Sequence, residues 1–203
     1  MPEPITTWFD LIRHGEPEGG PLFRGSKDDP LSDRGWSQMH AAIQSTDCWD
    51  AVLSSPLQRC LRFAEAIAKR EQIPLYEDKR LQEIGFGEWE GQTAEAIEKQ
   101  YGERLSLFWQ DPEANPPPGG ELLSMFQCRT LAAWSEWRDR LAGKRVLLVG
   151  HGGTIRVILG EVFGTLRERT FSAIDVPYAC RSRVRLDQSE HGLLSCLVSH
   201  GLR

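Results

Sequence analysis

Residues 146–156, with the sequence VLLVGHGGTIR, decide the fold of this 203-residue chain. The four apolar residues at the start predict a strand that is buried on both faces. The glycines that follow turn the chain into a helix with an apolar stripe, formed by Ile155, Ile158, Leu159 and Val162. A buried strand that leads directly into a helix is typical of a parallel sheet covered by helices.

Two earlier segments repeat this order of strand and helix. The apolar run 8–12 precedes a helix that Ser32 is expected to cap, with apolar residues at helical spacing after it. The run 51–53 is followed by Ser55, which is expected to cap a second helix, and by Pro56 at the first helical position. Strands joined by crossover helices run parallel. The sequence therefore predicts an α/β fold, a three-layer sandwich with a mostly parallel sheet and helices on both faces.

The last part of the chain has the pattern of a hairpin. Residues 181–186 alternate between polar and apolar, residues 187–192 predict a turn, and residues 193–198 can return as an antiparallel partner. We expect an antiparallel strand at the edge of the sheet, with its arginines on the solvated face, at positions 181, 183 and 185. The sequence leaves two alternatives for this edge: it is free, or it is the interface of a homodimer.

The length predicts one domain over residues 1–203. The segment 81–120 has a different composition, with a glycine-rich turn, helical stretches at 93–101 and 103–110, and a triple proline. We expect it to be a helical and loop cover inserted over the sheet, hereafter the cover segment. A long helix over residues 121–141 follows it.

The charge balance restricts the class of partner. The net charge of −5 and the pI near 5.6 argue against nucleic acid and against an anionic membrane surface, which both attract basic proteins. No apolar run approaches the length of a membrane span, and the cysteines form no CxxC pair. We therefore expect a cytoplasmic protein with a small-molecule ligand.

Cationic side chains follow three of the predicted strands. Arg13 and His14 end the first strand, Arg59 lies in the first turn of the helix after the second, and His151 follows the third. The carboxyl ends of parallel strands meet at one crevice, so these side chains should lie together. A cationic crevice in an acidic protein predicts an anionic ligand, and the helix N-termini near it favour phosphate.

Each of these residues also has an ordinary structural interpretation. A single histidine after a strand is more often exposed or hydrogen-bonded than functional, and single arginines on a helix are usually solvated. Gly152 and its neighbour could be simple turn glycines. Two histidines and a carboxylate could bind zinc, but cations crowd this site, so no metal is predicted.

Five ordered motifs resemble those of one family. Residues 11–16, LIRHGE, resemble the RHG signature of the histidine phosphatase superfamily, also called the phosphoglycerate mutase-like fold. The other matching segments are 29–38, 54–59, 81–91 and 150–156. The resemblance extends from residue 9 to residue 164. The sequences of the last two segments are most similar to those of α-ribazole phosphatases and related small-molecule phosphatases.

The resemblance implies a role for each matched residue. His14 is the nucleophile that forms a phosphohistidine, and Glu83 is the general acid and then the base, with Glu88 and Glu90 as rivals. The phosphate is expected to contact His151, Arg13, Arg59 and Gly152. The resemblance implies no cofactor.

The sequence departs from the family at two positions. Pro17 and Gly20 stand where the family often has a threonine and an asparagine that contact the phosphate. We therefore expect Arg24 to bend back and supply the missing donor. The leaving group is expected to be recognised by the cover, with Phe23, Arg24, Trp89, Tyr101 and Trp109 as the candidate side chains.

Taken with the resemblance, these residues predict a phosphomonoesterase that acts on a small phosphorylated metabolite. The resemblance suggests α-ribazole 5'-phosphate of cobalamin biosynthesis as one such substrate. Two other functions stay open. A phosphoglycerate mutase uses the same phosphohistidine but returns the phosphate to an isomeric hydroxyl, and a non-catalytic module of the same fold would only bind a phosphate ligand.

Overall fold

A computed structural model describes residues 5–165 and 171–202 of the chain. Its centre is a six-stranded sheet with the order β3-β2-β4-β1-β5-β6. Four neighbouring strands run parallel: β1 (Ile5–Arg13), β2 (Ala51–Ser54), β3 (Leu75–Glu77) and β4 (Arg145–Gly150). The predicted α/β class and mostly parallel sheet are confirmed.

The tail adds two strands to the sheet. β5 (Arg181–Ser189) pairs antiparallel with β1, and β6 (Gly192–Leu202) pairs antiparallel with β5 and forms the edge. The predicted antiparallel edge is therefore a complete hairpin, which begins beside the central strand.

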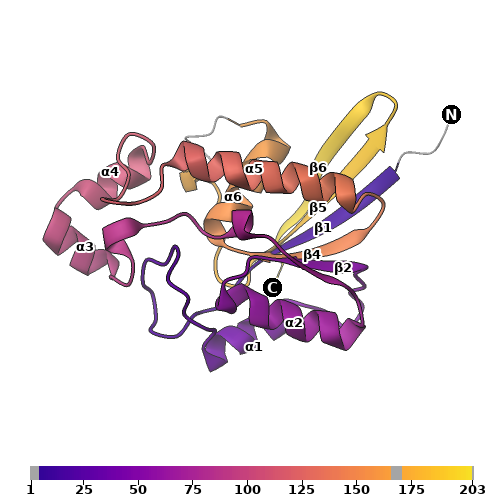
Figure 1. Ribbon diagram of the computed structural model, residues 1–203, viewed down its shortest axis with the longest axis horizontal. Helices are drawn as coiled ribbons and strands as arrows, with labels where there is room; N and C mark the ends of the chain where they lie inside the picture. Colours follow the sequence, from indigo (N-terminus) through magenta and orange to yellow (C-terminus); the bar gives the residue numbers. More distant parts are fainter. Residues whose placement is uncertain (1–4, 166–170, 203) are drawn as a thin grey trace.

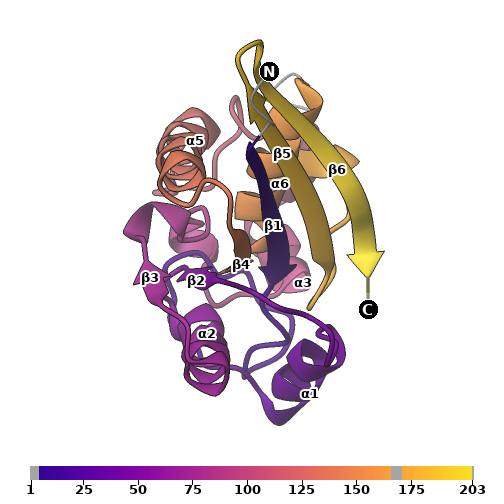
Figure 2. The same cartoon turned by 90° about the vertical axis from the view of Figure 1, so that its right-hand side faces the viewer.

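Helices cover both faces of the sheet (Figure 2). α1 (Asp33–Ala41) and α2 (Gln58–Glu71) lie on one face, and α5 (Leu123–Arg140) and α6 (Gly152–Phe163) lie on the other. Successive strand residues serve different layers: Leu11 packs with α5 and α6, whereas Ile12 packs with α1 and α2. Strands that are buried on both sides have no polar face, which explains their continuous apolar runs.

The two predicted helix starts differ in outcome. Ser32 caps α1 as expected, because its side chain accepts a hydrogen bond from the N–H of Gly35. The prediction that Ser55 caps the second helix is wrong: α2 begins at Gln58, after an extended Leu57. The hydroxyl of Ser55 lies 2.7 Å from Nε2 of His151 instead, so the side chain serves the site at the strand ends.

The cover segment lies beyond the ends of the parallel strands (Figure 1). It contains the short helices η1 (Lys79–Leu81) and η2 (Gly87–Trp89) and the predicted helices α3 (Ala94–Tyr101) and α4 (Arg104–Gln110). Its apolar side chains join side chains of α5 and α6 in a separate cluster, which includes Phe86, Trp89, Phe108, Phe126 and Val157. This cluster builds a wall beside the crevice at the strand ends. Within the described ranges, no helix is long and apolar enough to cross a membrane.

Candidate active site

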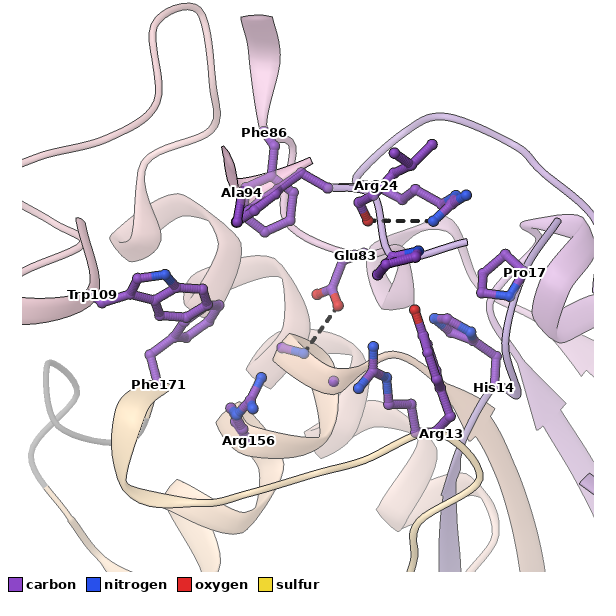
Figure 3. Close-up of a pocket in the computed structure, with 16 residues that line it drawn as sticks. Arg13, His14, Pro17, Arg24, Glu83, Phe86, Ala94, Trp109, Arg156 and Phe171 are labelled. Carbon is purple, nitrogen blue, oxygen red and sulfur yellow. Dashed lines mark hydrogen bonds between the residues drawn. The ribbon is translucent and has the colours of Figure 1, made fainter. Parts of the chain in front are cut away.

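A cavity of about 310 Å³ opens at the carboxyl ends of the parallel strands (Figure 3). Five of the predicted site residues line it: Arg13, His14, Arg24, Glu83 and Gly152. Arg59 and His151 do not line it, but both are fully buried in contact with the same site. The structure therefore brings the sequence-predicted residues to one place.

His14 follows β1 and is held by its backbone. Its N–H donates to the carbonyl of Gly150 at 2.9 Å, and its own carbonyl accepts from Ala179 at 3.2 Å. Gly15 allows a close approach to the start of α1, because a Cβ there would lie 2.2 Å from the carbonyl oxygen of Gly35. The turn after β1 therefore needs glycine at this position.

The imidazole of His14 is fixed in one tautomer. Its Nδ1 lies 2.7 Å from the carbonyl oxygen of Gly15, and a carbonyl can only accept, so Nδ1 carries the proton. The lone pair is therefore on Nε2. Burial, together with the charges of Arg13 and Arg59, holds the pKa of His14 well below its usual value. The ring is neutral near pH 7, as a nitrogen nucleophile requires.

Two arginines surround this ring, and their hydrogen bonds go to backbone carbonyls. Arg13 donates from Nη1 to the carbonyl of Val176 at 2.7 Å, and its guanidinium lies 4.3 Å from the ring centre of Tyr178. Arg59 donates to the carbonyls of Lys27 at 2.7 Å and Gly25 at 2.9 Å.

The charges of both guanidiniums are balanced at longer range and not by a direct ion pair: Glu83 acts to raise the pKa of each, and Asp28 that of Arg59. In the part of the chain that the structure describes, neither Arg13 nor Arg59 forms an ion pair, and both Nε atoms are buried without a hydrogen-bond partner. Burial lowers the pKa of each. Buried cations without a counter-ion are costly, and a bound anion would remove that cost.

His151 lies beside His14, with the two ring centres 5.3 Å apart. Its Nε2 lies 2.7 Å from the hydroxyl of Ser55 and 3.6 Å from the sulfur of Cys60. Burial, then the charge of Arg59, lowers the pKa of His151 well below its usual value, so the ring is neutral near pH 7. Burial raises the pKa of the Cys60 thiol to about 12, which excludes it as a thiolate nucleophile near pH 7.

Glu83 enters the cavity from the cover segment and meets the first turn of α6 (Figure 3). Its Oε2 accepts from the N–H of Gly153 at 3.1 Å, where the helix dipole favours negative charge. A Cβ at position 153 would lie 2.3 Å from Oε1 of Glu83, so a larger residue there would displace the carboxylate.

The two rival carboxylates have other partners. Glu90 accepts from the N–H groups of Ser26, Lys27 and Phe86, and so fixes the loop that precedes α1. Glu88 accepts from the hydroxyl of Tyr101 on the surface. Of the three acidic residues, Glu83 is the one that lines the cavity.

Arg24 lines the cavity but uses most of its donors within its own loop. Its Nε pairs with Asp29 at 2.7 Å, and its Nη atoms donate to the carbonyls of Gly20, Leu22 and Glu18. The guanidinium therefore braces the loop at Gly20, where the family donor is missing. Its expected contact with phosphate stays a prediction, since one remaining N–H would have to make it.

Sequence reasoning missed several residues of the cavity wall. Arg156 and Tyr178 line it, as do the aromatic side chains of Phe86 and Phe171. Of the side chains expected to meet a leaving group, Phe23, Arg24 and Trp109 line the cavity, whereas Trp89 is buried in the core of the cover segment. The position of Arg156, one turn after Gly152 on the same helix, was the available signal.

Comparison with known proteins places these residues in a family. The model of the histidine phosphatase superfamily (branch 1) matches residues 9–197. A 2,3-bisphosphoglycerate-dependent phosphoglycerate mutase of Rhizobium etli is 32% identical over 157 residues, covering 72% of this chain and 75% of the mutase. A glucosyl-3-phosphoglycerate phosphatase of Mycolicibacterium vanbaalenii is 31% identical over 166 residues, covering 76% and 73%.

Solved structures agree in fold. The alpha-ribazole phosphatase from Shigella flexneri superposes with a TM-score of 0.80 and 25% identity, covering 96% of each chain. The relatives include both phosphatases and mutases, so they do not by themselves select one reaction. Since the family match contains all five sequence motifs, the chain belongs to the histidine phosphatase superfamily.

Proposed function

We propose that the protein hydrolyses phosphate monoesters through a phosphohistidine formed on His14, without a metal ion. The observation that carries the proposal is the environment of this ring. A neutral imidazole with its lone pair on Nε2 lies beside two guanidiniums that form no ion pair with the described carboxylates. A phosphoryl group supplies the missing negative charge, and its phosphorus is the electrophile that the free nitrogen can attack.

The reaction has two steps in this site. Nε2 of His14 forms a bond to phosphorus while the bond from phosphorus to the ester oxygen breaks, and Glu83 gives its proton to the leaving oxygen. Glu83 then takes a proton from a water molecule, whose oxygen displaces the imidazole from phosphorus. Phosphate leaves, and His14 and Glu83 return to their starting states.

Arg13 and Arg59 would stabilise the transferring phosphoryl group through charge-assisted hydrogen bonds. His151 would join them once the phosphate is bound, because the dianion opposes the effect of burial and arginine charge that keeps the ring neutral. Loss of one such donor typically costs about 10²–10³ in rate.

The substrate we propose is a small phosphorylated metabolite. The cavity has room for an organic leaving group beyond the phosphate, and part of its wall is aromatic. The similarity to an alpha-ribazole phosphatase makes α-ribazole 5'-phosphate the first substrate to test. The similarity to a phosphoglycerate mutase favours mutase activity as the second candidate, in which a bisphosphate primer loads His14 and water is excluded.

The test is phosphate release in excess EDTA from phenyl phosphate, α-ribazole 5'-phosphate and 3-phosphoglycerate. We expect release from at least one ester by the wild type and none above background by His14→Ala. Acid-labile ³²P on the protein after a rapid quench would identify the intermediate. Activity that disappears with EDTA would overturn the metal-free mechanism, and isomerisation of 3-phosphoglycerate that needs a bisphosphate primer would favour the mutase. Phosphate binding without turnover would indicate a binding module.

A further inference from the structure

The backbone of residues 80–83, which carries Glu83 to the cavity, is held by side chains from two helices. Its four consecutive carbonyls all accept hydrogen bonds. Arg129 of α5 donates to three of them, at positions 80, 82 and 83, over 2.8, 2.7 and 3.0 Å. Thr154 of α6 donates to the carbonyl at position 81 over 3.1 Å. The path of this segment therefore depends mainly on one guanidinium.

The orientation of that guanidinium is itself fixed. Nε and Nη2 of Arg129 donate to the two carboxylate oxygens of Glu121, each over 2.7 Å. Glu121 also accepts from the N–H of Gly85 at 3.2 Å, which ties the next turn of the loop to the same ion pair. An arginine has five N–H donors. The ion pair and the three carbonyls use all of them in Arg129, so none is left for a ligand.

Glu83 is the side chain that the segment 80–83 contributes to the cavity, and Arg129 is not among the described residues that line it. The carboxylate of Glu83 meets only two backbone N–H groups, those of Ile84 and Gly153, each at 3.1 Å (Figure 3). A proton donor must lie about 2.6–3.2 Å from the oxygen that it protonates. A displacement of about 1 Å can cost about 10² in rate. The backbone that carries Glu83 must therefore be held closely.

We propose, building on the proposed phosphatase activity, that Arg129 is a positioning residue for the proton transfer, which holds the Glu83 carboxyl at the leaving oxygen by binding the backbone of residues 80–83. The role is geometric, because Glu121 already neutralises the charge of Arg129 at 2.7 Å. Loss of Arg129 should therefore slow the reaction of those esters whose leaving oxygen needs a proton.

The test compares two esters that differ in this need. 4-Nitrophenolate leaves without a proton because its nitro group stabilises the negative charge, whereas the alkoxide of benzyl phosphate must be protonated as it leaves. The quantity measured is kcat/KM, which reports formation of the phosphohistidine and not its hydrolysis. Arg129→Met should lower kcat/KM about 30-fold to 100-fold for benzyl phosphate, and less than about threefold for 4-nitrophenyl phosphate.

Three further variants show how Arg129 acts. Glu83→Gln should give the same selective loss, and adding Arg129→Met to it should lower kcat/KM little further, because both changes remove one proton transfer. Arg129→Lys should recover part of the loss, since it keeps the charge but not the planar fork. Arg140→Met removes an exposed arginine from the same helix and should keep the wild-type value for both esters.

Three results would overturn this role of Arg129 and leave the phosphatase proposal intact. The first is an equal loss on both esters in Arg129→Met, and the second is a loss that adds fully to that of Glu83→Gln. The third is full recovery in Arg129→Lys. The effect would then come from charge, because Arg129 is one of the cations that, after burial, lower the pKa of His151.

A measurement without turnover tests the same inference if the wild type releases phosphate from neither ester. The N–H of Gly153 donates to the carboxylate of Glu83, so its NMR signal in ¹⁵N-labelled protein should shift when Glu83 is titrated. Glu83→Gln should abolish that shift. Arg129→Met should lose most of it, and Arg140→Met should keep it. A wild-type shift of Gly153 in Arg129→Met would show that Glu83 keeps its place without Arg129, and the inference would be wrong.

Discussion

Two groups of arginines lie beside the central strand β1, and they differ in their partners. Arg181 is 3% exposed and donates to the carboxylates of both Asp10 and Asp47, with Arg183 on the other side of Asp10. Arg59 is 0% exposed and donates to two backbone carbonyls, with no carboxylate at ion-pair distance among the described residues. We refer to Arg181 and Arg183 with their two aspartates as the paired cluster. The unpaired cluster is Arg59 with Arg13, His14 and His151.

The difference separates a structural charge from a functional one. The paired cluster neutralises its own charge, and hydrogen bonds from Arg183, Arg181 and Trp49 outweigh burial to hold the pKa of Asp10 below its usual value. The unpaired cluster adds Arg13 and two neutral histidines to Arg59, and among the described residues neither arginine has a carboxylate at ion-pair distance. A protein folds around such a cluster only at a cost in stability, which a bound anion offsets.

The largest expected effect is on stability at the paired cluster. Arg181→Met should lower the free energy of unfolding by about 3 kcal/mol, because it removes the buried cation that pairs with both Asp10 and Asp47 and leaves them with the more exposed Arg183, at 2.7 and 3.6 Å. Urea denaturation at pH 7.5 measures it. Arg34→Met, which removes an exposed arginine from a 3.4 Å ion pair, is the control and should cost less than about 1 kcal/mol. Equal losses in the two variants would show that the paired cluster adds no stability of its own.

A substitution in the unpaired cluster should reduce activity strongly and stability less. Arg59→Met should lower kcat/KM for a phosphate monoester by about 10²–10³, since one buried donor to the transferring group is lost. Its loss of stability should be smaller than that of Arg181→Met, because a buried cation without a counter-ion disappears with it. Arg62→Met, at an exposed position of the same helix, is the matched control. A variant that unfolds more easily than Arg181→Met yet keeps its activity would reverse our assignment of the two clusters.

The pH dependence of stability should also distinguish the clusters. His14 and His151 have pKa values well below the unfolded value of about 6.5, so the unfolded state binds more protons and stability falls as the pH drops below 6.5. Between pH 7.5 and 5.5 we expect a loss of about 1.4 kcal/mol for each histidine. Denaturation curves at both pH values measure it, and His14→Ala should show about half of the decrease.

The paired cluster responds in a more acidic range. Asp10 and Asp47 have lowered pKa values, so their contribution is present above the unfolded value near 4 and is lost as the pH falls through the folded values. Arg181→Met should therefore keep the wild-type decrease between pH 7.5 and 5.5. If this decrease disappears in Arg181→Met, it comes from the paired cluster, and our assignment of it to the two histidines is wrong.

The sequence predicted the unpaired cluster better than the paired one. His14 and His151 follow apolar runs long enough to identify buried parallel strands, and such strands end at one edge. Arg181 was expected on a solvated face because alternation predicts a strand with one face in water. That interpretation is wrong, since its partners Asp10 and Asp47 lie 171 and 134 residues away in the chain and no local pattern connects them.

The same limit applies within the site. The motif that contains Arg156 places it on a helix after His151, but its cavity depends on Trp109 and Phe171 from two distant segments. Ser55 has the sequence of a helix cap, and local propensity predicts that role. In the structure the Ser55 hydroxyl lies beside His151, because the loop after β2 and the loop after β4 meet only in the folded sheet.

The smallest expected effect tests the contact between Ser55 and His151. Ser55→Ala removes the hydroxyl 2.7 Å from Nε2 of His151 and should lower kcat about fivefold to tenfold, the equivalent of about 1 kcal/mol of hydrogen bonding. KM should change less, because Arg13 and Arg59 still hold the phosphate. Ser54→Ala is a close control: Ser54 is equally buried, but its hydroxyl donates to the carbonyl of Ser55 at 2.8 Å. If both variants lose stability and only Ser55→Ala loses kcat, Ser55 positions His151; equal kcat values would assign it a structural role alone.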